Sequence, residues 1–420
     1  MQTSVSPRRR RAAAPEEATS GWWRHDRLRY ADGELRLGDS AAGALAREHG
    51  SPLDVLDLEV ARRAADRLRS AFGAISHPAE LYFALKANRS RPLLEAFTAA
   101  GVGMDCCSPN EVALAMECGA SPRAISFTGT ALSDRDVEAI GGLDLRLNLD
   151  SISAIHKVGR RFPGRRIGLR VNPQVGVGAT EQLTYAGKRP TKFGIYADRF
   201  DEALRLAASY GLIVEGVHMH VGSGWLAEGM PSFLDAATRL CGFARRVPDL
   251  RYVNVGGGIG VVHGPGQAPV DLDAYARGLS ERVRSTLGDV EICVEPGEYL
   301  VGPAGVSLAE VTMVEEKGGV LFVGLDVGFN SNPQAAHYAF EHAILPTVEP
   351  GPSSGVRPCT VVGNINEAID VFAHDVLLPP VHEGDVLAIL NTGAYARSMA
   401  SDHCLRERAS EVVLDGPVAR

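Results

Sequence analysis

From residue 81 onward, short apolar runs alternate with amphipathic segments along the chain. Buried parallel strands read as short continuous apolar runs, whereas the helices that cover them carry apolar residues on one face only. Eight runs fit the strand pattern, and each but the last is followed by a helical segment before the next begins. They are Leu81–Leu85, Val102–Asp105, Ala124–Phe127, Leu145–Leu149, Ile167–Val171, Val214–His220, Tyr252–Val255 and Glu291–Glu295.

This alternation of strand and helix predicts an α/β fold with a parallel sheet. Eight such units are the number that closes a (β/α)8 barrel, so we predict a TIM-type barrel over residues 57–305. A doubly wound open sheet is the alternative, because the order of strands and helices does not show whether the sheet closes.

The pattern changes after the eighth strand. Within residues 306–420, the stretches 308–326 and 357–415 are rich in Val, Thr and Gly, with turn signals such as Lys317-Gly318-Gly319 and Glu383-Gly384-Asp385. These features are typical of an antiparallel β domain. We therefore predict a second domain of this kind, which follows the barrel in the sequence.

Ahead of the barrel, residues 27–37 resemble a hairpin around Asp32-Gly33. We expect residues 21–56 to form a segment that packs with the β domain. The first 20 residues carry the basic run Arg8–Arg11 but no apolar signal core. They are therefore expected to be a disordered tail rather than a secretory signal.

Composition narrows the classes of protein that remain. The chain has 420 residues and a formal net charge of −8, which argues against a nucleic-acid partner. No apolar run approaches the ~18 residues that a membrane span needs. The seven cysteines show no C-x-x-C spacing, so neither a disulfide framework nor a zinc site is expected. We interpret the chain as a cytoplasmic protein with reduced thiols.

A barrel of this type places its active site at the C-terminal ends of the strands. Lys86 ends the first strand, in Tyr82-Phe83-Ala84-Leu85-Lys86-Ala87-Asn88. An ammonium among apolar neighbours has a depressed pKa, which a Schiff-base lysine requires. Taken alone, a strand-end lysine would more simply reach solvent.

The sixth strand ends in His218-Met219-His220-Val221-Gly222-Ser223-Gly224. A histidine at a strand end can stack on a flat ring, and the Gly/Ser turn after it can bind phosphate. His218 and His220 face the same way, so a metal pair is an alternative. No third ligand stands at a suitable spacing, and we expect no metal.

The seventh and eighth strands end in motifs that suit an anion and a ring nitrogen. Val255 is followed by Gly256, Gly257 and Gly258, whose backbone N–H groups can approach a phosphate closely. Glu295 ends the eighth strand, where a carboxylate can pair with a protonated pyridine nitrogen. Two further predicted strands also end in a charged residue, Asp105 on the second strand and Arg170 on the fifth.

Together these motifs resemble the fold-type III pyridoxal-phosphate decarboxylases, the ornithine and diaminopimelate decarboxylase family. The resemblance covers roughly residues 45 to 415. Its markers are Phe83-Ala84-Leu85-Lys86-Ala87-Asn88, Lys192-Phe193-Gly194, His220-Val221-Gly222-Ser223-Gly224, Gly256-Gly257-Gly258, Glu295-Pro296-Gly297, Asp326-Val327-Gly328, Glu367 with Asp370, Gly384-Asp385, and Thr392-Gly393-Ala394-Tyr395.

The resemblance implies a role for each of these positions. Lys86 would hold pyridoxal 5'-phosphate as a Schiff base, His220 would stack on its ring, and Glu295 would bind the pyridine nitrogen. The remaining cofactor-binding residues would be Ser223, Gly256, Gly257, Gly258 and Tyr395 around the phosphate, with Asp105 and Arg170. Members of this family are head-to-tail homodimers, and the loop Gly363–Asp370 would complete the partner's active site.

The chain departs from the family pattern at the substrate end of the site. Glu298 stands where the family has an arginine after Glu-Pro-Gly, and no arginine precedes Tyr338 in residues 332–338. In diaminopimelate decarboxylases these two arginines clamp the distal carboxylate of the substrate. Their absence indicates a substrate with a cationic or neutral polar distal end, in a specialised rather than a lysine-producing role.

A third departure concerns the proton donor. Asn366, followed by Glu367, replaces the usual cysteine, and an amide cannot act as a general acid. With Glu298 and Tyr338, the loop residues Asn366, Glu367 and Asp370 are the expected substrate contacts. The donor would then be Lys86, Glu367, water or Cys404.

These observations predict a pyridoxal-phosphate-dependent amino-acid α-decarboxylase. A catalytically weak regulatory homologue is one alternative, supported by the changes at Glu298 and Asn366. An amino-acid racemase is another, although racemases of this fold face the pyridine nitrogen with arginine rather than with a carboxylate such as Glu295.

Overall fold

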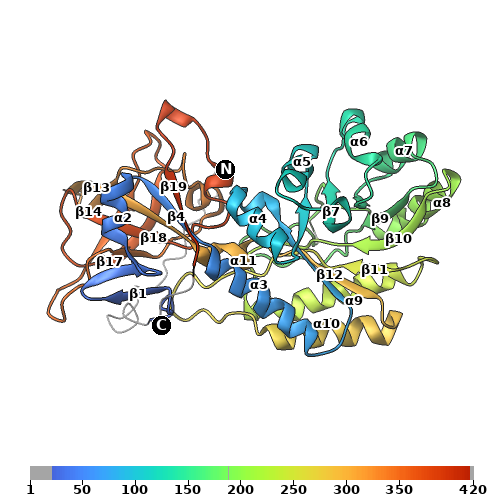
Figure 1. Ribbon diagram of the computed structural model, residues 1–420, viewed down its shortest axis with the longest axis horizontal. Helices are drawn as coiled ribbons and strands as arrows, with labels where there is room; N and C mark the ends of the chain where they lie inside the picture. Colours follow the sequence, from blue (N-terminus) through green and yellow to red (C-terminus); the bar gives the residue numbers. More distant parts are fainter. Residues whose placement is uncertain (1–20, 188, 417–420) are drawn as a thin grey trace, which may run out of the picture.

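The computed structural model describes residues 21–187 and 189–416, so the tail expected at residues 1–20 lies outside the described residues. A barrel and a β-rich domain lie side by side along the long axis of the molecule (Figure 1). Each has its own hydrophobic core of buried side chains. No helix within the described ranges is both long and apolar enough to cross a membrane.

Eight parallel strands close into a barrel, which confirms the predicted fold class and excludes the open doubly wound sheet. Pairing between β12 and β5 closes the ring, because it joins the last strand of the barrel to the first. The eight strands are β5 (Ala79–Ala84), β6 (Gly103–Cys106), β7 (Ile125–Gly129), β8 (Arg146–Leu149), β9 (Arg166–Arg170), β10 (Ile213–His218), β11 (Tyr252–Asn254) and β12 (Glu291–Val294).

The helices between these strands cover the outside of the barrel (Figure 1). Several begin at a side chain that accepts hydrogen bonds from the first free N–H groups, as a helix N-terminus requires. Asp57, Ser108, Ser133, Ser151 and Asp271 are such caps. The helices are α3 (Leu58–Gly73), α4 (Arg91–Ala99), α5 (Pro109–Glu117), α6 (Asp134–Gly141), α7 (Ile152–Arg161), α8 (Phe200–Ser209), α9 (Met230–Ala244), α10 (Leu272–Leu287) and the short α11 (Glu298–Val301).

The second domain is built on a mixed sheet, and in this detail the prediction of an antiparallel domain is wrong. Most pairs are antiparallel, but β14 pairs with β16 in parallel and β19 pairs with β4 in parallel. The strands are β13 (Gly305–Lys317), β14 (Val320–Leu325), β15 (Ile344–Pro346), β16 (Arg357–Val362), β17 (Val371–Leu378), β18 (Val386–Leu390) and β19 (Ser410–Leu414).

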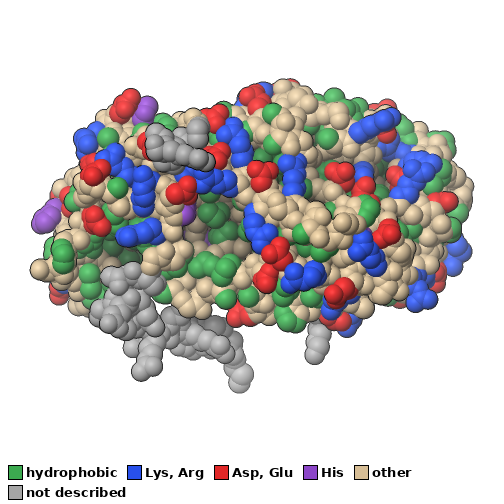
Figure 2. Space-filling view, turned by 60° about the horizontal axis from the view of Figure 1, so that its bottom comes forward, with side chains coloured by type: hydrophobic (Ala, Val, Ile, Leu, Met, Phe, Trp, Pro, Cys, Tyr) green, Lys and Arg blue, Asp and Glu red, His purple; other side chains and the backbone are tan. Residues whose placement is uncertain are grey.

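The segment before the barrel belongs structurally to this sheet. Its last strand, β4 (Leu53–Asp57), lies between β13 and β19. Ahead of it come the expected hairpin of β1 (Leu28–Ala31) and β2 (Glu34–Leu37), then β3 (Ser40–Ala41) and α2 (Ala42–His49). Between the two domains, Figure 2 shows a hollow with hydrophobic side chains on a face where acidic and basic groups are interspersed.

Asp57 joins the β domain to the barrel through two interactions. Its carboxylate lies 2.5 Å from Arg27 Nε, and both side chains are buried. The same carboxylate accepts hydrogen bonds from the N–H groups of Glu59 and Val60 and so begins α3. One side chain therefore ends β4, caps the helix that leads into the barrel, and neutralises a buried guanidinium.

We expect Asp57→Ala to lower the free energy of unfolding by about 3–5 kcal/mol, because it leaves the buried Arg27 charge without its partner. Urea denaturation measures this loss. The matched control is Asp144→Ala, which breaks the exposed pair between Asp144 and Arg123 and should cost less than about 1 kcal/mol. Equal losses in the two variants would contradict this account.

Candidate active site

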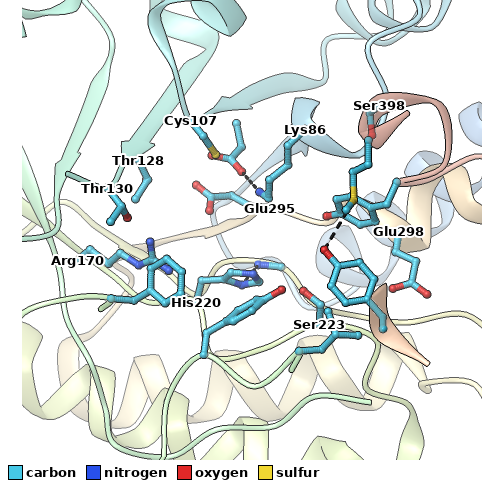
Figure 3. A pocket seen from close by; sticks show the side chains of 18 of the residues that line it. Lys86, Cys107, Thr128, Thr130, Arg170, His220, Ser223, Glu295, Glu298 and Ser398 are labelled. Atoms are coloured by element: carbon cyan, nitrogen blue, oxygen red, sulfur yellow. Dashed lines mark hydrogen bonds and ion pairs between the residues drawn. The ribbon is translucent and has the colours of Figure 1, made fainter. Parts of the chain in front are cut away.

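One cavity of about 520 Å³ opens where the C-terminal ends of the barrel strands face the β domain. Figure 3 shows side chains from both domains converging on it. The barrel contributes Lys86, Asp105, Cys107, Thr128, Thr130, Arg170, Leu183, Tyr185, Phe193, His218, His220, Ser223, Gly257, Glu295 and Glu298, and the C-terminal domain contributes Gln334, Tyr338, Phe340, Tyr395, Ser398 and Met399.

Lys86 lies in a single 3-10 turn, Leu85–Ala87, directly after β5. Its Nζ is 3.0 Å from Asp105 Oδ2, at the end of the neighbouring strand β6. Burial by itself would lower the pKa of Lys86, but the Asp105 carboxylate, together with Cys107 and Tyr395, raises it well above the usual value. The expectation of a depressed pKa from the apolar sequence context is therefore wrong, because the partner comes from another strand.

Glu295 follows β12 and is held by side chains from three other strands of the barrel. Its Oε1 accepts hydrogen bonds from Ser126 Oγ at 2.8 Å and Asn254 Nδ2 at 2.6 Å, and its Oε2 lies 2.9 Å from His218 Nε2. Burial alone would raise the pKa of Glu295, but His218, together with Lys86 and Ser126, lowers it to about 2. Glu295 is therefore a carboxylate at neutral pH.

His218 and His220 both line the cavity, as their spacing predicted, but they make different contacts. His218 turns to Glu295, whereas Nδ1 of His220 accepts a hydrogen bond from the Gly257 N–H at 3.3 Å. The His220 ring also lies 5.1 Å from that of Tyr185. Burial lowers the pKa of His220 well below its usual value, so its ring is neutral.

The glycine-rich turn after β11 packs against neighbouring backbone with no room for side chains. Gly256 and Gly258 have φ angles of 68° and 108°, and a Cβ on Gly257 would lie 2.0 Å from the carbonyl oxygen of Glu295. Beside the turn, Trp225 Nε1 is buried without a hydrogen-bond partner. The backbone of Gly257 thus lines the cavity directly, and the N–H of Trp225 next to the turn remains without a hydrogen-bond partner.

Arg170 occupies another part of the wall, with its guanidinium 4.7 Å from the centre of the Phe193 ring. Cys107, which was not among the residues singled out in the sequence, also lines the cavity. Burial raises the pKa of its thiol to about 12, so it stays protonated at neutral pH. The signal for Cys107 was its place just after β6, two residues beyond Asp105.

Glu298 and Tyr338 both reach the cavity, from α11 and α12 (Gln334–Tyr338) respectively. The side chain of Glu298 is only 11% exposed, and its Oε1 lies 3.4 Å from Nε2 of His263. His263 was not among the residues singled out in the sequence. It lies in the loop after the triple glycine.

The loop residues Asn366, Glu367 and Asp370 do not line the cavity of their own chain. Asn366 and Glu367 are exposed. Asp370 is buried and accepts hydrogen bonds from the N–H groups of Phe329 and Ile365, so within the chain it orders its own loop. These residues were expected to complete the partner's active site, and that role stays a prediction.

Comparisons with known proteins agree with the architecture and the cavity described above. The family described as "Pyridoxal-dependent decarboxylase, pyridoxal binding domain" matches residues 58–302. The chain belongs to this family. It is 34% identical to a diaminopimelate decarboxylase of Methanothermobacter thermautotrophicus, over 91% of each chain. It is 32% identical to that of Streptomyces coelicolor, over 90% of this chain and 87% of the other.

Solved structures of the family have the same architecture. Diaminopimelate decarboxylase from Helicobacter pylori, complexed with L-lysine, superposes with a TM-score of 0.81 at 28% identity. The match covers 89% of this chain and 94% of the other. The chain is thus a pyridoxal-phosphate-dependent amino-acid decarboxylase, as the sequence predicted.

The cavity fits pyridoxal 5'-phosphate on several independent points. Lys86 supplies an amine at the end of β5, held by its ion pair with Asp105, and Glu295 supplies an anion for the ring nitrogen. The backbone of Gly257, where a Cβ would find no room, and the hydroxyls of Ser223 and Tyr395 line one part of the cavity and suit a phosphate. When bound, the cofactor supplies an electron sink for the carbanion chemistry of the α-carbon.

We expect borohydride reduction of the cofactor-loaded protein to fix the mass of the cofactor on Lys86, because reduction makes a Schiff base permanent. Peptide mass spectrometry measures the label, and Lys86→Arg should abolish it. The control is Lys192→Arg, since Lys192 lies near the cavity, over the Phe193 ring, but does not line it. Label on Lys192, or label that survives in Lys86→Arg, would contradict the assignment.

Proposed function

We propose that this decarboxylase acts on an amino acid whose distal end is cationic or neutral and polar rather than a carboxylate. The observation that carries the proposal is Glu298, a nearly buried carboxylate in the cavity wall with His263 as its neighbour. A substrate carboxylate about 4 Å from Glu298 would be repelled by about 4 kcal/mol at an effective dielectric constant of 20. A distal ammonium would gain a similar interaction.

The basic groups of the cavity lie elsewhere. Among the cavity-lining residues in the described part of the chain, Lys86 and Arg170 are the ones that carry a permanent basic group. Lys86 is paired with Asp105, and Figure 3 shows Arg170 on the opposite side of the view from Glu298. Neither is placed to clamp a carboxylate at the Glu298 end.

Diaminopimelate is the second candidate substrate, because the named relatives are diaminopimelate decarboxylases. The two candidates differ in one property, the charge that the cavity must accept beside Glu298. Substrate turnover therefore separates them directly.

We expect the cofactor-loaded protein to release carbon dioxide from a basic or citrulline-like amino acid, in one configuration, and to leave meso-diaminopimelate largely unused. The measurement is carbon dioxide release across D- and L-amino acids with basic, neutral polar and acidic side chains. Efficient turnover of diaminopimelate with none of the basic or neutral polar amino acids would overturn the proposal.

Two variants of Glu298 test the physical reason. Glu298→Arg should lower kcat/KM for a basic substrate by at least about 100-fold, since it replaces attraction by repulsion. Glu298→Gln keeps the shape and removes the charge, so its loss should be smaller and should appear mainly in KM. An equal effect of both variants would show that Glu298 acts through packing rather than charge.

The return of a proton to the substrate falls to other residues than Asn366. Asn366 carries no acidic proton, and within the chain it does not line the cavity. Lys86 and Cys107 line the cavity and both hold a proton at neutral pH. We infer that one of these two is the donor.

We also propose that the chain forms a homodimer in which the loop Gly363–Asp370 completes the partner's site. Support comes from exposed apolar side chains on and near this loop. Ile369 is 55% exposed and Leu405 is 89% exposed. Glu367 Oε1 and His403 Nε2 lie 3.5 Å apart and join the loop to the segment that carries Leu405. Apolar groups exposed together in this way are typical of an interface.

We expect the protein to sediment at twice the mass of one chain, and Ile369→Asp with Leu405→Asp to shift it toward the monomer with loss of activity. The control is Val348→Asp, because Val348 is equally exposed at 68% but lies beside β2, in another part of the β domain. A monomeric wild-type protein with full activity would contradict the proposal.

A further inference from the structure

Four strands of the barrel meet at Glu295 in a fully buried set of hydrogen bonds. Ser126 lies on β7, Asn254 ends β11, and His218 ends β10. All three are at most 1% exposed, and Glu295 is 5% exposed. Two of the bonds end on Oε1 and one ends on Oε2. Oε2 therefore keeps acceptor capacity for a group in the cavity, which Glu295 lines.

The hydroxyl of Ser126 is itself held in one orientation. Asn148 Nδ2 lies 3.2 Å from Ser126 Oγ and donates to it, while Tyr252 Oη donates to Asn148 Oδ1 at 2.8 Å. Because Ser126 Oγ accepts from Asn148, its own hydroxyl proton is donated to Oε1 of Glu295. A Cβ on Gly168 would lie 2.2 Å from Asn148 Oδ1 and 2.4 Å from Tyr252 Oη, so a glycine on β9 leaves the room for this chain of bonds.

The environment of His218 determines its tautomer. Its Nδ1 is buried without a hydrogen-bond partner, whereas Nε2 faces the Glu295 carboxylate. Burial lowers the pKa of His218, although Glu295 opposes that change. A neutral ring with its proton on Nε2 satisfies both observations. The set then holds three neutral donors around one carboxylate, and the negative charge of Glu295 is not cancelled.

We propose that Ser126, His218 and Asn254 are positioning residues that keep Glu295 ionised and oriented toward the cavity. An ionised Glu295 stabilises a proton on the ring nitrogen of the bound cofactor, and a neutral one does not. The inference rests on the proposed contact of Glu295 with that nitrogen. It is independent of the substrate, because the contact exists before any substrate binds.

The test uses the full-length protein loaded with pyridoxal phosphate labelled with ¹⁵N in the ring, without substrate. The ¹⁵N chemical shift reports whether the ring nitrogen carries a proton. In the wild type we expect the shift of a protonated pyridine at neutral pH. In His218→Leu and Asn254→Leu the shift should move toward that of neutral pyridine, with kcat reduced about 10- to 100-fold and little change in KM.

Two matched variants separate positioning from damage to the core. His218→Gln places an amide N–H where Nε2 was, so it should restore the shift of the protonated ring and most of kcat. Ile292→Ala shortens a buried apolar side chain on β12 that makes none of these hydrogen bonds, and should leave the shift unchanged. Thermal unfolding and cofactor content confirm that each variant is folded and loaded.

An unprotonated ring nitrogen in the wild type would overturn the inference together with the role of Glu295. A protonated shift that persists in His218→Leu and Asn254→Leu would overturn the role of the three donors alone. Failure to identify a substrate would leave both readings of the ¹⁵N shift intact, so the inference fails separately from the proposed specificity.

Discussion

A carboxylate inside a barrel is stable only if its charge is solvated by the protein, because a buried charge without partners costs several kcal/mol. Glu295 meets this requirement with donors from three other strands. One of these donors, Ser126, is in turn oriented by Asn148 and Tyr252, for which a glycine on β9 leaves space. Many of the buried polar side chains near the cavity therefore contribute to stabilising the negative charge of Glu295.

Closure of the barrel is what makes such solvation achievable. In an open sheet the ends of the first and last strands would be far apart, whereas here β12 pairs with β5. Lys86, Asp105 and Glu295 are thus brought to one cavity, although more than two hundred residues separate the first from the last. The β domain adds side chains such as Tyr338 and Tyr395 to the wall of this cavity, and Glu295 is left with little access to water.

The same cavity divides into regions of different charge. Lys86 and Asp105 form one ion pair, next to the C-terminal end of β5. Glu298 and His263 form another pair, closer to the β domain. The first pair is suited to a reaction common to the whole family, since it includes the amine that binds the cofactor. The second would be suited to selection among substrates, as we propose, since Glu298 is a nearly buried carboxylate in the cavity wall.

Sequence pattern alone was sufficient for the eight strands and the barrel, because each strand is carried by a local signal. Apolar runs mark the strands, and strand number places Lys86, the triple glycine and Glu295 at one end of the barrel. The mixed sheet of the β domain was not predicted, since β4 reaches it from before the barrel and no local signal records the direction of such a pairing.

Only the tertiary structure decided how the site residues are paired. The pKa of Lys86 is raised rather than lowered because Asp105, on another strand, lies 3.0 Å away. His218 contacts Glu295 and His263 contacts Glu298, and in each pair the two residues are far apart in the sequence. A residue type and its place on a strand determine which chemistry is available. The charge that a group carries depends on neighbours that folding brings within a few ångströms, and the sequence does not list them.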